Sequence, residues 1–372
     1  MKEGWEIKKI KDICDKGSSN VAQKDLEGHN GIYPIYGASG YIKGVDFYHQ
    51  EKEYVGVVKD GSGIGRVSFY PPKSSLIGTL QYIFPKEGYD IRYVGYCLQS
   101  LNLASYRQGA AIPHIYFRDY GEREVLAAID KKEQQRIVEI LDKEFEMIDA
   151  LKANAEKNLQ NAKDLFQAAL KKELEPREGW TTKHLNELAS FSIGLTYKPD
   201  NVQPRGTIVL RSSNIQNDEL ALDDLVRVDC PIKQELYVKK GDILMCSRNG
   251  SRRLVGKVAL IKDTEERMTY GTFMTVIRSE YNPILYYFFL SNSFRRQLES
   301  GENPMINQIT KYMLNEVLVS VPTNKHEINR ITTTLDELNA KCKVLQDNYT
   351  KTIALCDDLK QSLLRKAFNG EL

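Results

Sequence analysis

Two stretches of the chain carry apolar or small residues at alternating intervals of four and three positions, from 137 to 169 and from 331 to 363. Neither stretch contains glycine or proline, the residues that interrupt helices. A period of about 3.5 residues makes a narrow seam that suits one partner helix. We therefore predict two long helices that pair with each other. The predicted seam positions are Ile137, Leu141, Glu144, Ile148, Leu151, Ala155, Asn158, Ala162, Leu165 and Ala169, and Ile331, Leu335, Leu338, Cys342, Leu345, Tyr349, Thr352, Cys356, Leu359 and Leu363.

The segments that precede these helices have a different pattern, in which aromatic or β-branched residues alternate with glycine-rich turns. The pattern occurs at 32–48, 52–72, 206–215, 236–248 and 255–261. It is typical of short strands joined by tight turns. Two apolar stretches, 91–109 and 284–301, predict short helices that close each segment. We predict two mixed α and β heads, which gives an α+β fold class.

The chain also contains an internal repeat. Its only two tryptophans, Trp5 and Trp180, stand in the same Glu-Gly-Trp triplet, and the residues that follow recur at an offset of 175. The helical stretches match without a gap at an offset of 194. The chain is therefore predicted to be two copies of one unit. We assign a first head at 1–130, a first long helix at 131–175, a second head at 176–322 and a second long helix at 323–372.

The connectivity of two tandem copies predicts their arrangement. If the long helices pack antiparallel, a pseudo-twofold axis relates the copies and the heads lie at opposite ends. About 35 residues at roughly 1.5 Å each make a helix on the order of 50 Å long. The helix pair is thus predicted to be a spacer of fixed length.

Composition limits the classes of protein that fit. The 52 Lys and Arg residues against 50 Asp and Glu give a net charge of +2, which excludes a strongly basic nucleic-acid protein but not a local basic surface. The six cysteines form no Cys-x-x-Cys pair, so neither a zinc site nor a disulfide framework is indicated. No leader or membrane-spanning pattern occurs. We expect a cytoplasmic protein with no membrane association.

The sequence lacks complete versions of the catalytic motifs that its segments partly resemble. The segment Tyr70 to Lys73 has neither the first nor the fourth residue of an adenine-methyltransferase tetrad. The segment Gly250 to Lys257 lacks the spacing of a phosphate-binding loop. The five histidines are scattered and pair with no nucleophile that the sequence supports. We expect a chain without catalytic residues or a bound metal.

Several motifs together resemble the specificity subunits of type I restriction-modification systems over nearly the whole chain. The motifs are the Gly4-Trp5 and Gly179-Trp180 openings, YPIYGASG (33–40), YVKKGDILMCSRNGS (237–251), GKVALI (256–261), INQIT (306–310) and LKQSLLRKAFNGEL (359–372). The family's Pro-x-x-x-Glu-Gln-x-x-Ile signature at the head exits is incomplete here. The first copy has Glu133 and Gln134 without the proline, and the second has Pro322 without the Gln.

The resemblance implies a DNA-reading subunit without chemistry of its own. Each head would be a target recognition domain that reads one half of a bipartite site in double-stranded DNA, and the helices would set the unread spacer. Two methyltransferase subunits would bind the paired helices and the adjoining head surfaces, and restriction-translocase subunits would join through them. S-adenosylmethionine, ATP and Mg²⁺ would belong to those partners, with no cofactor in this chain.

Polar loops in each head are the candidate DNA contacts, because reading needs phosphate anchors and side chains that pair with base edges. The strongest concentration follows Ser247, and an equivalent glycine-rich loop lies in the first head. In each case the alternative is a solvated hairpin or a capped turn. The candidates are Lys59, Ser62, Arg66, Arg107 and Gln108 in the first head, and Arg211, Asn214, Arg248, Asn249, Ser251, Arg252, Arg253, Lys257, Asn307 and Gln308 in the second.

Two other classes stay open from the sequence. One is a coiled-coil interaction scaffold with two ligand-binding heads and no role in DNA modification. The other is an unassigned DNA nuclease. A salt-dependent interaction with random duplex DNA separates the main interpretation from the scaffold, and metal-dependent cleavage by the isolated chain would identify a nuclease.

Overall fold

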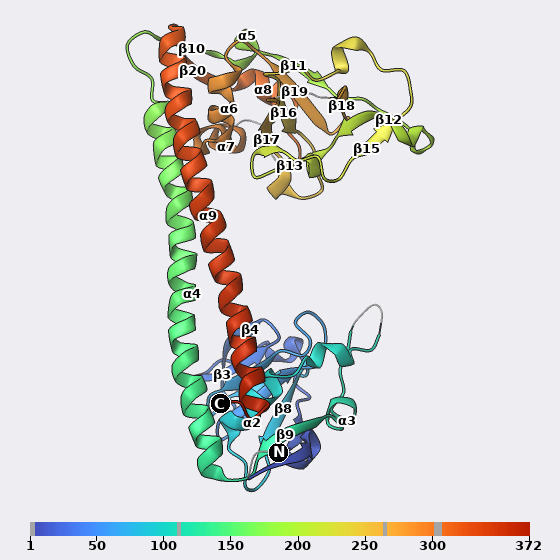
Figure 1. Cartoon of the computed structure of the whole chain (residues 1–372), viewed down its shortest axis with the longest axis vertical. Coiled ribbons are helices and arrows are strands. Elements are labelled where there is room, and N and C mark those ends of the chain that lie inside the picture. The colour runs from blue at the N-terminus through green and yellow to red at the C-terminus, as the bar shows by residue number, and fades with distance from the viewer. Residues whose placement is uncertain (1–3, 110–112, 263–265, 301–306) are drawn as a thin grey trace. The chain divides into compact units, whose positions relative to one another are not determined.

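The computed structural model describes residues 4–109, 113–262, 266–300 and 307–372. Glu3 of the first triplet and Ile306 of the INQIT motif lie outside these residues. The chain forms two compact units, Met1–Glu156 with Thr350–Leu372, and Lys157–Tyr349. Each unit therefore contains one head together with parts of both long helices, α4 (Lys131–Glu173) and α9 (Lys325–Phe368) (Figure 1).

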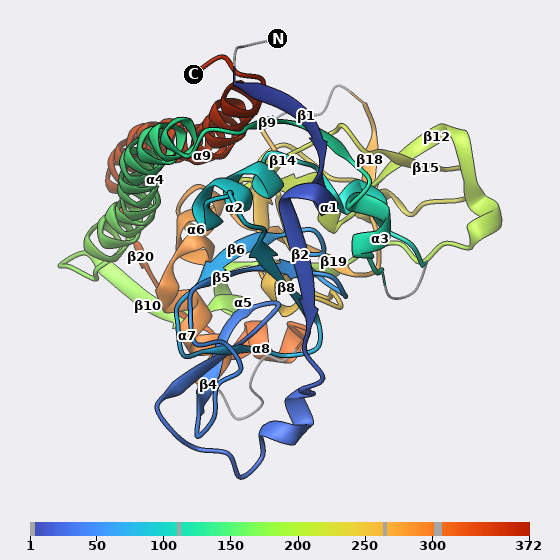
Figure 2. The same cartoon turned by 90° about the horizontal axis from the view of Figure 1, so that it is seen from below.

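The first head is built from two sheets and a strand pair. One sheet has the antiparallel order β2-β8-β5-β6, the other the order β4-β3-β7 with β7 parallel to β3, and β1 pairs with β9. Helix α2 packs on β5, β6 and β8 (Figure 2). The elements are β1 (Trp5–Lys9), α1 (Ile10–Ile13), β2 (Cys14–Ser18), β3 (Tyr33–Gly37), β4 (Gly40–Val45), β5 (Tyr54–Val58), β6 (Val67–Tyr70), β7 (Ser75–Leu76), β8 (Leu80–Pro85), α2 (Ile91–Gln99), α3 (Phe117–Tyr120) and β9 (Glu124–Ala128).

The second head repeats this topology. Its sheets have the orders β11-β19-β16-β17 and β15-β12-β18, with β18 parallel to β12, and β10 pairs with β20. The elements are β10 (Trp180–His184), α5 (Leu185–Leu188), β11 (Ser190–Ile193), β12 (Val202–Leu210), β13 (Ile215–Gln216), β14 (Glu219–Leu220), β15 (Val226–Val228), β16 (Ile243–Cys246), β17 (Val258–Leu260), β18 (Met268–Tyr270), β19 (Met274–Arg278), α6 (Asn282–Leu290), α7 (Asn292–Ser300), α8 (Lys311–Glu316) and β20 (Leu318–Pro322).

The internal repeat is confirmed by matching contacts in the two units. Trp5 lies opposite Ala128 across the first strand pair, and Trp180 lies opposite Pro322 across the second. The hydroxyl of Tyr96 donates a hydrogen bond to Asp142, and in the second unit a tyrosine hydroxyl of α6 does the same to Asp336. The aspartates are 194 residues apart, the offset of the helical match. The mixed α and β heads are likewise as predicted.

The long helices run antiparallel within each unit, as predicted. In the first unit the ammonium of Lys152 lies 2.6 Å from Asp357, and that of Lys360 lies 2.5 Å from Asp149. These pairs join the N-terminal half of α4 to the C-terminal half of α9. The seam between the helices contains Ile148, Ala155, Cys342 and Cys356, all buried, so the two cysteines are small core residues of the helix pair.

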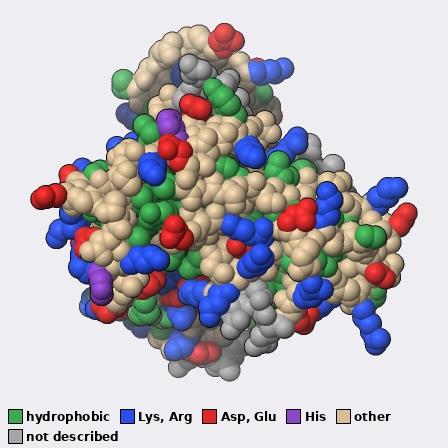
Figure 3. Space-filling view, turned by 90° about the horizontal axis from the view of Figure 1, so that it is seen from above, with side chains coloured by type: hydrophobic (Ala, Val, Ile, Leu, Met, Phe, Trp, Pro, Cys, Tyr) green, Lys and Arg blue, Asp and Glu red, His purple; other side chains and the backbone are tan. Residues whose placement is uncertain are grey.

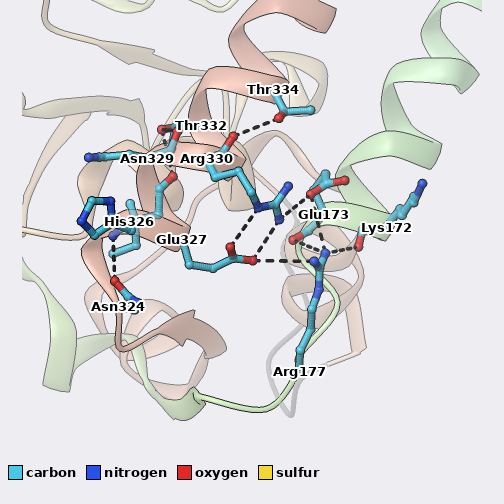
Figure 4. A network of polar contacts seen from close by, with 11 residues as sticks. Lys172, Glu173, Arg177, Asn324, His326, Glu327, Asn329, Arg330, Thr332 and Thr334 are labelled. Atoms are coloured by element: carbon cyan, nitrogen blue, oxygen red, sulfur yellow. Dashed lines mark hydrogen bonds and ion pairs between the residues drawn. The ribbon is translucent and has the colours of Figure 1, made fainter.

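In the second unit an ionic network joins the end of α4 to the start of α9 (Figure 4). Arg330 lies 2.9 Å from Glu327 on its own helix and 3.1 Å from Glu173 on α4, and Arg177 lies 3.6 Å from Glu327. The hydrogen bonds that Arg330 donates to Glu327, and then to Glu173, hold the pKa of Arg330 above its ordinary value. The network fixes the antiparallel register at this end.

The predicted heptad register is correct at most positions and wrong at five of the twenty, which are exposed. Leu151 and Leu165 on α4, and Leu345 and Leu359 on α9, were placed in the seam, but between 39% and 52% of each is exposed. Asn158 is exposed as well. The buried or half-buried positions lie one residue later, at Lys152, Leu159, Phe166, Gln346, Ile353 and Lys360. The core of the second head includes Phe166, the residue that follows the exposed Leu165.

Gln134 is the Gln of the incomplete Pro-x-x-x-Glu-Gln-x-x-Ile signature, and it lies where the first head joins α4. Its side chain is fully buried at the start of α4. The amide nitrogen donates to the carbonyl oxygens of Ala128 (2.9 Å) and Gly88 (3.2 Å), and the amide oxygen accepts from the backbone of Asp90 (2.8 Å). One side chain thus ties the helix to β9 and to the turn before α2. In the second copy Ile328 takes this place.

Replacing Gln134 by Ala is expected to destabilise the first unit by about 1–3 kcal/mol, because the backbone groups of Gly88, Asp90 and Ala128 lose their side-chain partner and the contact with Ala128 is buried. The measurement is urea unfolding followed through the fluorescence of Trp5, in a chain whose other tryptophan is replaced by Trp180→Phe. Gln135→Ala, an exposed neighbour on the same helix, is the matched control and should change the free energy of unfolding by less than about 0.5 kcal/mol. Equal stability of the two variants would show that the hydrogen bonds of Gln134 do not stabilise the junction between α4 and the first head.

Candidate nucleic-acid interface

In the second head, three of the predicted polar segments come together. The backbone of Arg248 pairs with that of Gln308, and the amide of Ile309 donates to Ser247 at 2.7 Å. The side-chain amide of Asn249 donates to the hydroxyl of Ser212 at 3.1 Å. The loop between β16 and β17 therefore adjoins both the 211–214 turn and the 307–309 segment.

The loop between β16 and β17 has a closed base and an exposed tip. At the base, the amide of Cys246 donates to Lys257 at 2.9 Å and the amide of Gly256 donates to Cys246 at 2.8 Å. Burial raises the pKa of the Cys246 thiol to about 11, so the thiol stays protonated at neutral pH. Ser251, Arg252 and Arg253 are exposed at the tip, whereas Lys257 is half-buried. The hydrogen bonds at the base therefore hold the exposed tip in place, and a large ligand can contact it.

The arginines of this loop differ in their contacts. The guanidinium of Arg248 lies 5.4 Å from the ring centre of Phe273, an exposed aromatic side chain. Arg252 forms an ion pair of 3.0 Å with Glu299. Both arginines remain accessible, since Arg248 is exposed and 60% of the Arg252 side chain is exposed. Anionic ligands could therefore reach them without unfolding the loop.

The prediction that Asn214 reads bases is wrong for this structure. Its side chain is fully buried, donates to the carbonyl oxygens of Ala221 (2.9 Å) and Asp224 (3.0 Å), and accepts from the backbone of Arg211 (2.9 Å). Arg211 itself forms an ion pair of 2.8 Å with Asp224. Ser247, at the start of the loop, is also buried and donates to Phe273. The alternative of a capped turn is the correct one for Asn214.

The first head has its equivalent loop between β5 and β6. The amide of Gly65 donates to Val58 at 2.8 Å, which closes the loop base. Arg66 is exposed and donates to the carbonyl oxygen of Ala38 at 2.5 Å, Ser62 is exposed, and Lys59 lies 3.7 Å from Asp60. A strand follows the loop rather than a helix, so it is a glycine hairpin and not a phosphate-binding turn.

Arg107 and Gln108 in the first head are not the structural counterparts of Asn307 and Gln308 in the second. The amide of Ile115 donates to Lys59 at 2.9 Å, as the amide of Ile309 donates to Ser247 in the second head. The structural counterparts of Asn307 and Gln308 are therefore Pro113 and His114. Gln108 lies beside them, because its backbone pairs with that of His114, and Arg107 is exposed next to it.

His114 and its neighbour Asp60 are candidate residues that the sequence reasoning missed. The ring nitrogen Nδ1 of His114 lies 2.6 Å from a carboxylate oxygen of Asp60. The sequence held a signal for this position, since Ile-Pro-His-Ile (112–115) and Ile-Asn-Gln-Ile (306–309) are 194 residues apart. The same offset of 194 relates the two helical stretches.

Positive and negative side chains are intermingled on the face of the molecule seen in Figure 3, where Lys and Arg stand among Asp and Glu. Among the described residues, no group of three or more His, Cys, Asp or Glu side chains could hold a metal ion. None of the helices in the described ranges combines the length and the apolar character that crossing a membrane requires.

Comparisons with known proteins agree with this architecture. A family model described as type I restriction modification DNA specificity domain matches residues 2–161 and 177–347. Over 206 residues the chain is 28% identical to the type I restriction enzyme EcoKI specificity subunit of Escherichia coli (strain K12) and 26% identical to the StySPI specificity subunit of Salmonella potsdam. Each match covers 52% of this chain and 44% of the relative, so less than half of each relative's length is spanned.

A solved chain has the same fold. It comes from a structure described as the structural basis underlying complex assembly and conformational transition of the type I R-M system. The TM-score is 0.72, with 16% sequence identity, over 100% of this chain and 99% of that one. At this identity the similarity establishes the fold alone.

Proposed function

The chain belongs to the family of type I restriction modification DNA specificity domains, with both of its copies matched, and we propose that it is the DNA-specificity subunit of a type I restriction-modification complex. Each head would bind one half of a bipartite, asymmetric site in double-stranded DNA. The observation that carries the proposal is the repeated loop cluster. The same topological position holds Lys59 to Arg66 in one head and Arg248 to Lys257 in the other.

The differences between the two loops favour an asymmetric site. The first loop is rich in glycine, which lets a backbone approach DNA closely, and the second is rich in arginine, which suits phosphates and guanine edges. Two heads of the same topology with different loop side chains would read different half-sites. The length of the paired helices would set the number of unread base pairs between them.

The chain would bind DNA without catalysing a reaction. Adenine methylation would be carried out by two methyltransferase subunits, and cleavage by restriction-translocase subunits, in the cytoplasm. S-adenosylmethionine, ATP and Mg²⁺ would be bound by those partners. The comparisons lend no support to the scaffold interpretation, because all the relatives named above are specificity subunits or part of a type I system.

The exposed leucines support a partner-binding role for the helices. Leu151 and Leu345 are equivalent at the offset of 194, and so are Leu165 and Leu359, and all four are exposed on the long helices, where Met147, Val344 and Leu355 are exposed as well. Apolar side chains that recur at equivalent exposed positions suit a contact with two copies of one partner. We propose that one methyltransferase subunit contacts Leu151 and Leu359 in the first unit and that a second contacts Leu165 and Leu345 in the second unit.

Co-expression with the methyltransferase subunit of its own system tests this function. The expected product is a complex of two methyltransferase subunits and one copy of this chain, measured by mass photometry, which binds random duplex DNA with an affinity that falls steeply with salt. A chain that purifies alone and does not bind duplex DNA at low salt would contradict the proposal.

A further inference from the structure

In each head, one segment hydrogen-bonds to the base of the candidate loop through Ile115 or Ile309. Three alternate positions in this segment occupy the same place in both heads. They are His114, Tyr116 and Arg118 in the first head and Gln308, Thr310 and Tyr312 in the second, each pair 194 residues apart. The buried residues between and after them also correspond, since Ile115 and Tyr120 pack in one core and Ile309 and Leu314 in the other. In an extended backbone, alternate side chains share a face. The inward residues therefore turn His114, Tyr116 and Gln308 outward, whereas the hydroxyl of Thr310 accepts a hydrogen bond of 3.2 Å from the amide of Met313 at the start of α8.

In the first head these side chains stack on one another at the surface. The ring centres of His114 and Tyr116 are 6.4 Å apart with an interplanar angle of 22°, and the guanidinium of Arg118 lies 4.6 Å from the ring centre of Tyr116. The exposed fractions are 39% for the His114 side chain, 41% for Tyr116 and 74% for the Arg118 side chain. We call these three residues the His-Tyr-Arg ladder.

Two acidic residues orient the ladder. Asp60, on the glycine-rich loop, lies 2.6 Å from Nδ1 of His114, which leaves the other ring nitrogen, Nε2, for an external partner. Asp119 lies 3.7 Å from Arg118 and accepts a hydrogen bond of 2.9 Å from Gln108. The amide of Gly61 also donates to Pro113 at 3.1 Å. The ladder is thus fastened to the candidate DNA-binding loop by both backbone and side chains.

We propose that the His-Tyr-Arg ladder reads base edges in the half-site bound by the first head, and that Gln308 and Tyr312 do so in the second. This assignment rests on the proposed function. Nε2 of His114 offers one hydrogen-bonding position, the guanidinium of Arg118 can pair with the N7 and O6 acceptors of guanine, and Tyr116 supplies a flat apolar face between them. The second head presents an amide and a phenol at the outer positions instead, which would select different bases.

The experiment uses the complex with its methyltransferase and a plasmid library in which both half-sites are randomised. Methylated molecules are sequenced to give base preference at each position. His114→Asn keeps an amide nitrogen near the position of Nδ1, so the contact with Asp60 survives while Nε2 is lost. Arg118→Ala removes the guanidinium, and Gln308→Ala is the matched variant in the second head. Melting temperatures are measured for all of them.

His114→Asn and Arg118→Ala are each expected to reduce discrimination by roughly 10-fold to 100-fold at one base pair of one half-site, and to leave the other half-site and the melting temperature unchanged. Gln308→Ala should affect the other half-site only. Unchanged base preference in both first-head variants, beside a wild-type complex that methylates a bipartite site, would overturn the ladder assignment alone. A wild-type complex with no bipartite site would overturn the proposed function and the ladder together.

Discussion

Replacing Arg248, Arg252 and Arg253 together by Ala is expected to weaken binding to duplex DNA by about 100-fold to 1,000-fold at physiological salt. Each phosphate contact releases condensed counterions. Each lost contact should therefore make the negative slope of log K against log salt concentration shallower by about 0.9. Three lost contacts should reduce the slope by about 3. Arg252 should contribute least, because DNA must compete with Glu299 for its guanidinium.

This result can be separated from a general effect of charge. Lys157→Ala, Lys163→Ala and Lys341→Ala together remove the same number of charges from exposed positions on the long helices. This control should keep the wild-type salt slope if DNA binds at the loop. Fluorescence anisotropy of a labelled random duplex, titrated at several salt concentrations, measures both quantities. An equal slope for the loop variant and the wild type would exclude the loop as a phosphate anchor.

Replacing Leu151 and Leu359 by Glu is expected to remove one of the two methyltransferase subunits from the complex. The ion pairs Lys152 to Asp357 and Asp149 to Lys360 set a register in which the two leucines stand level with each other on α4 and α9. Both are about half exposed, at 52% and 47%. A charge placed in an apolar contact loses hydration without gaining a partner, which costs several kcal/mol. We expect binding to weaken at least about 100-fold.

A control on the same helices distinguishes this surface from the helices as a whole. Ala153 and Ala354 are exposed and, at about 100° per residue, point well away from the two leucines. Changing them to Glu should leave the two-to-one complex intact. Urea unfolding should differ little between the two double variants, since neither alters a buried residue. If the leucine variant still forms the two-to-one complex, the methyltransferase subunits do not contact these leucines.

The sequence was sufficient to predict the two-copy architecture but not the phase of the helix seam. The tryptophan triplets and the 194-residue offset predicted equivalent heads, and the strand pairs of Trp5 and Trp180 confirm them. The heptad reading favoured Leu151 and Leu345 because leucine is the usual seam residue. Their exposure shows that repeated leucines can mark a surface as well as a core, and periodicity does not distinguish the two.

The candidate site was predictable in its loops but not in its individual side chains. Strand patterns on both sides of 247–257 indicated an exposed loop, and its arginines are indeed exposed. Asn214 could not be excluded from sequence, since an Asn in a turn can either read a base or cap the backbone. His114 was missed because its role depends on Asp60, which is 54 residues away in the chain. Such contacts arise from the sheet topology rather than from local pattern.

Mapping methylated adenines in DNA treated with the reconstituted methyltransferase complex tests the central claim most directly. If each head reads one half-site, all methylated adenines should lie in a single motif with two defined halves and an unread spacer between them. The Gln308→Ala variant, which changes an exposed side chain, should then relax one half of the motif and preserve the other. A motif read as one continuous block, or methylation without sequence preference, would contradict the account.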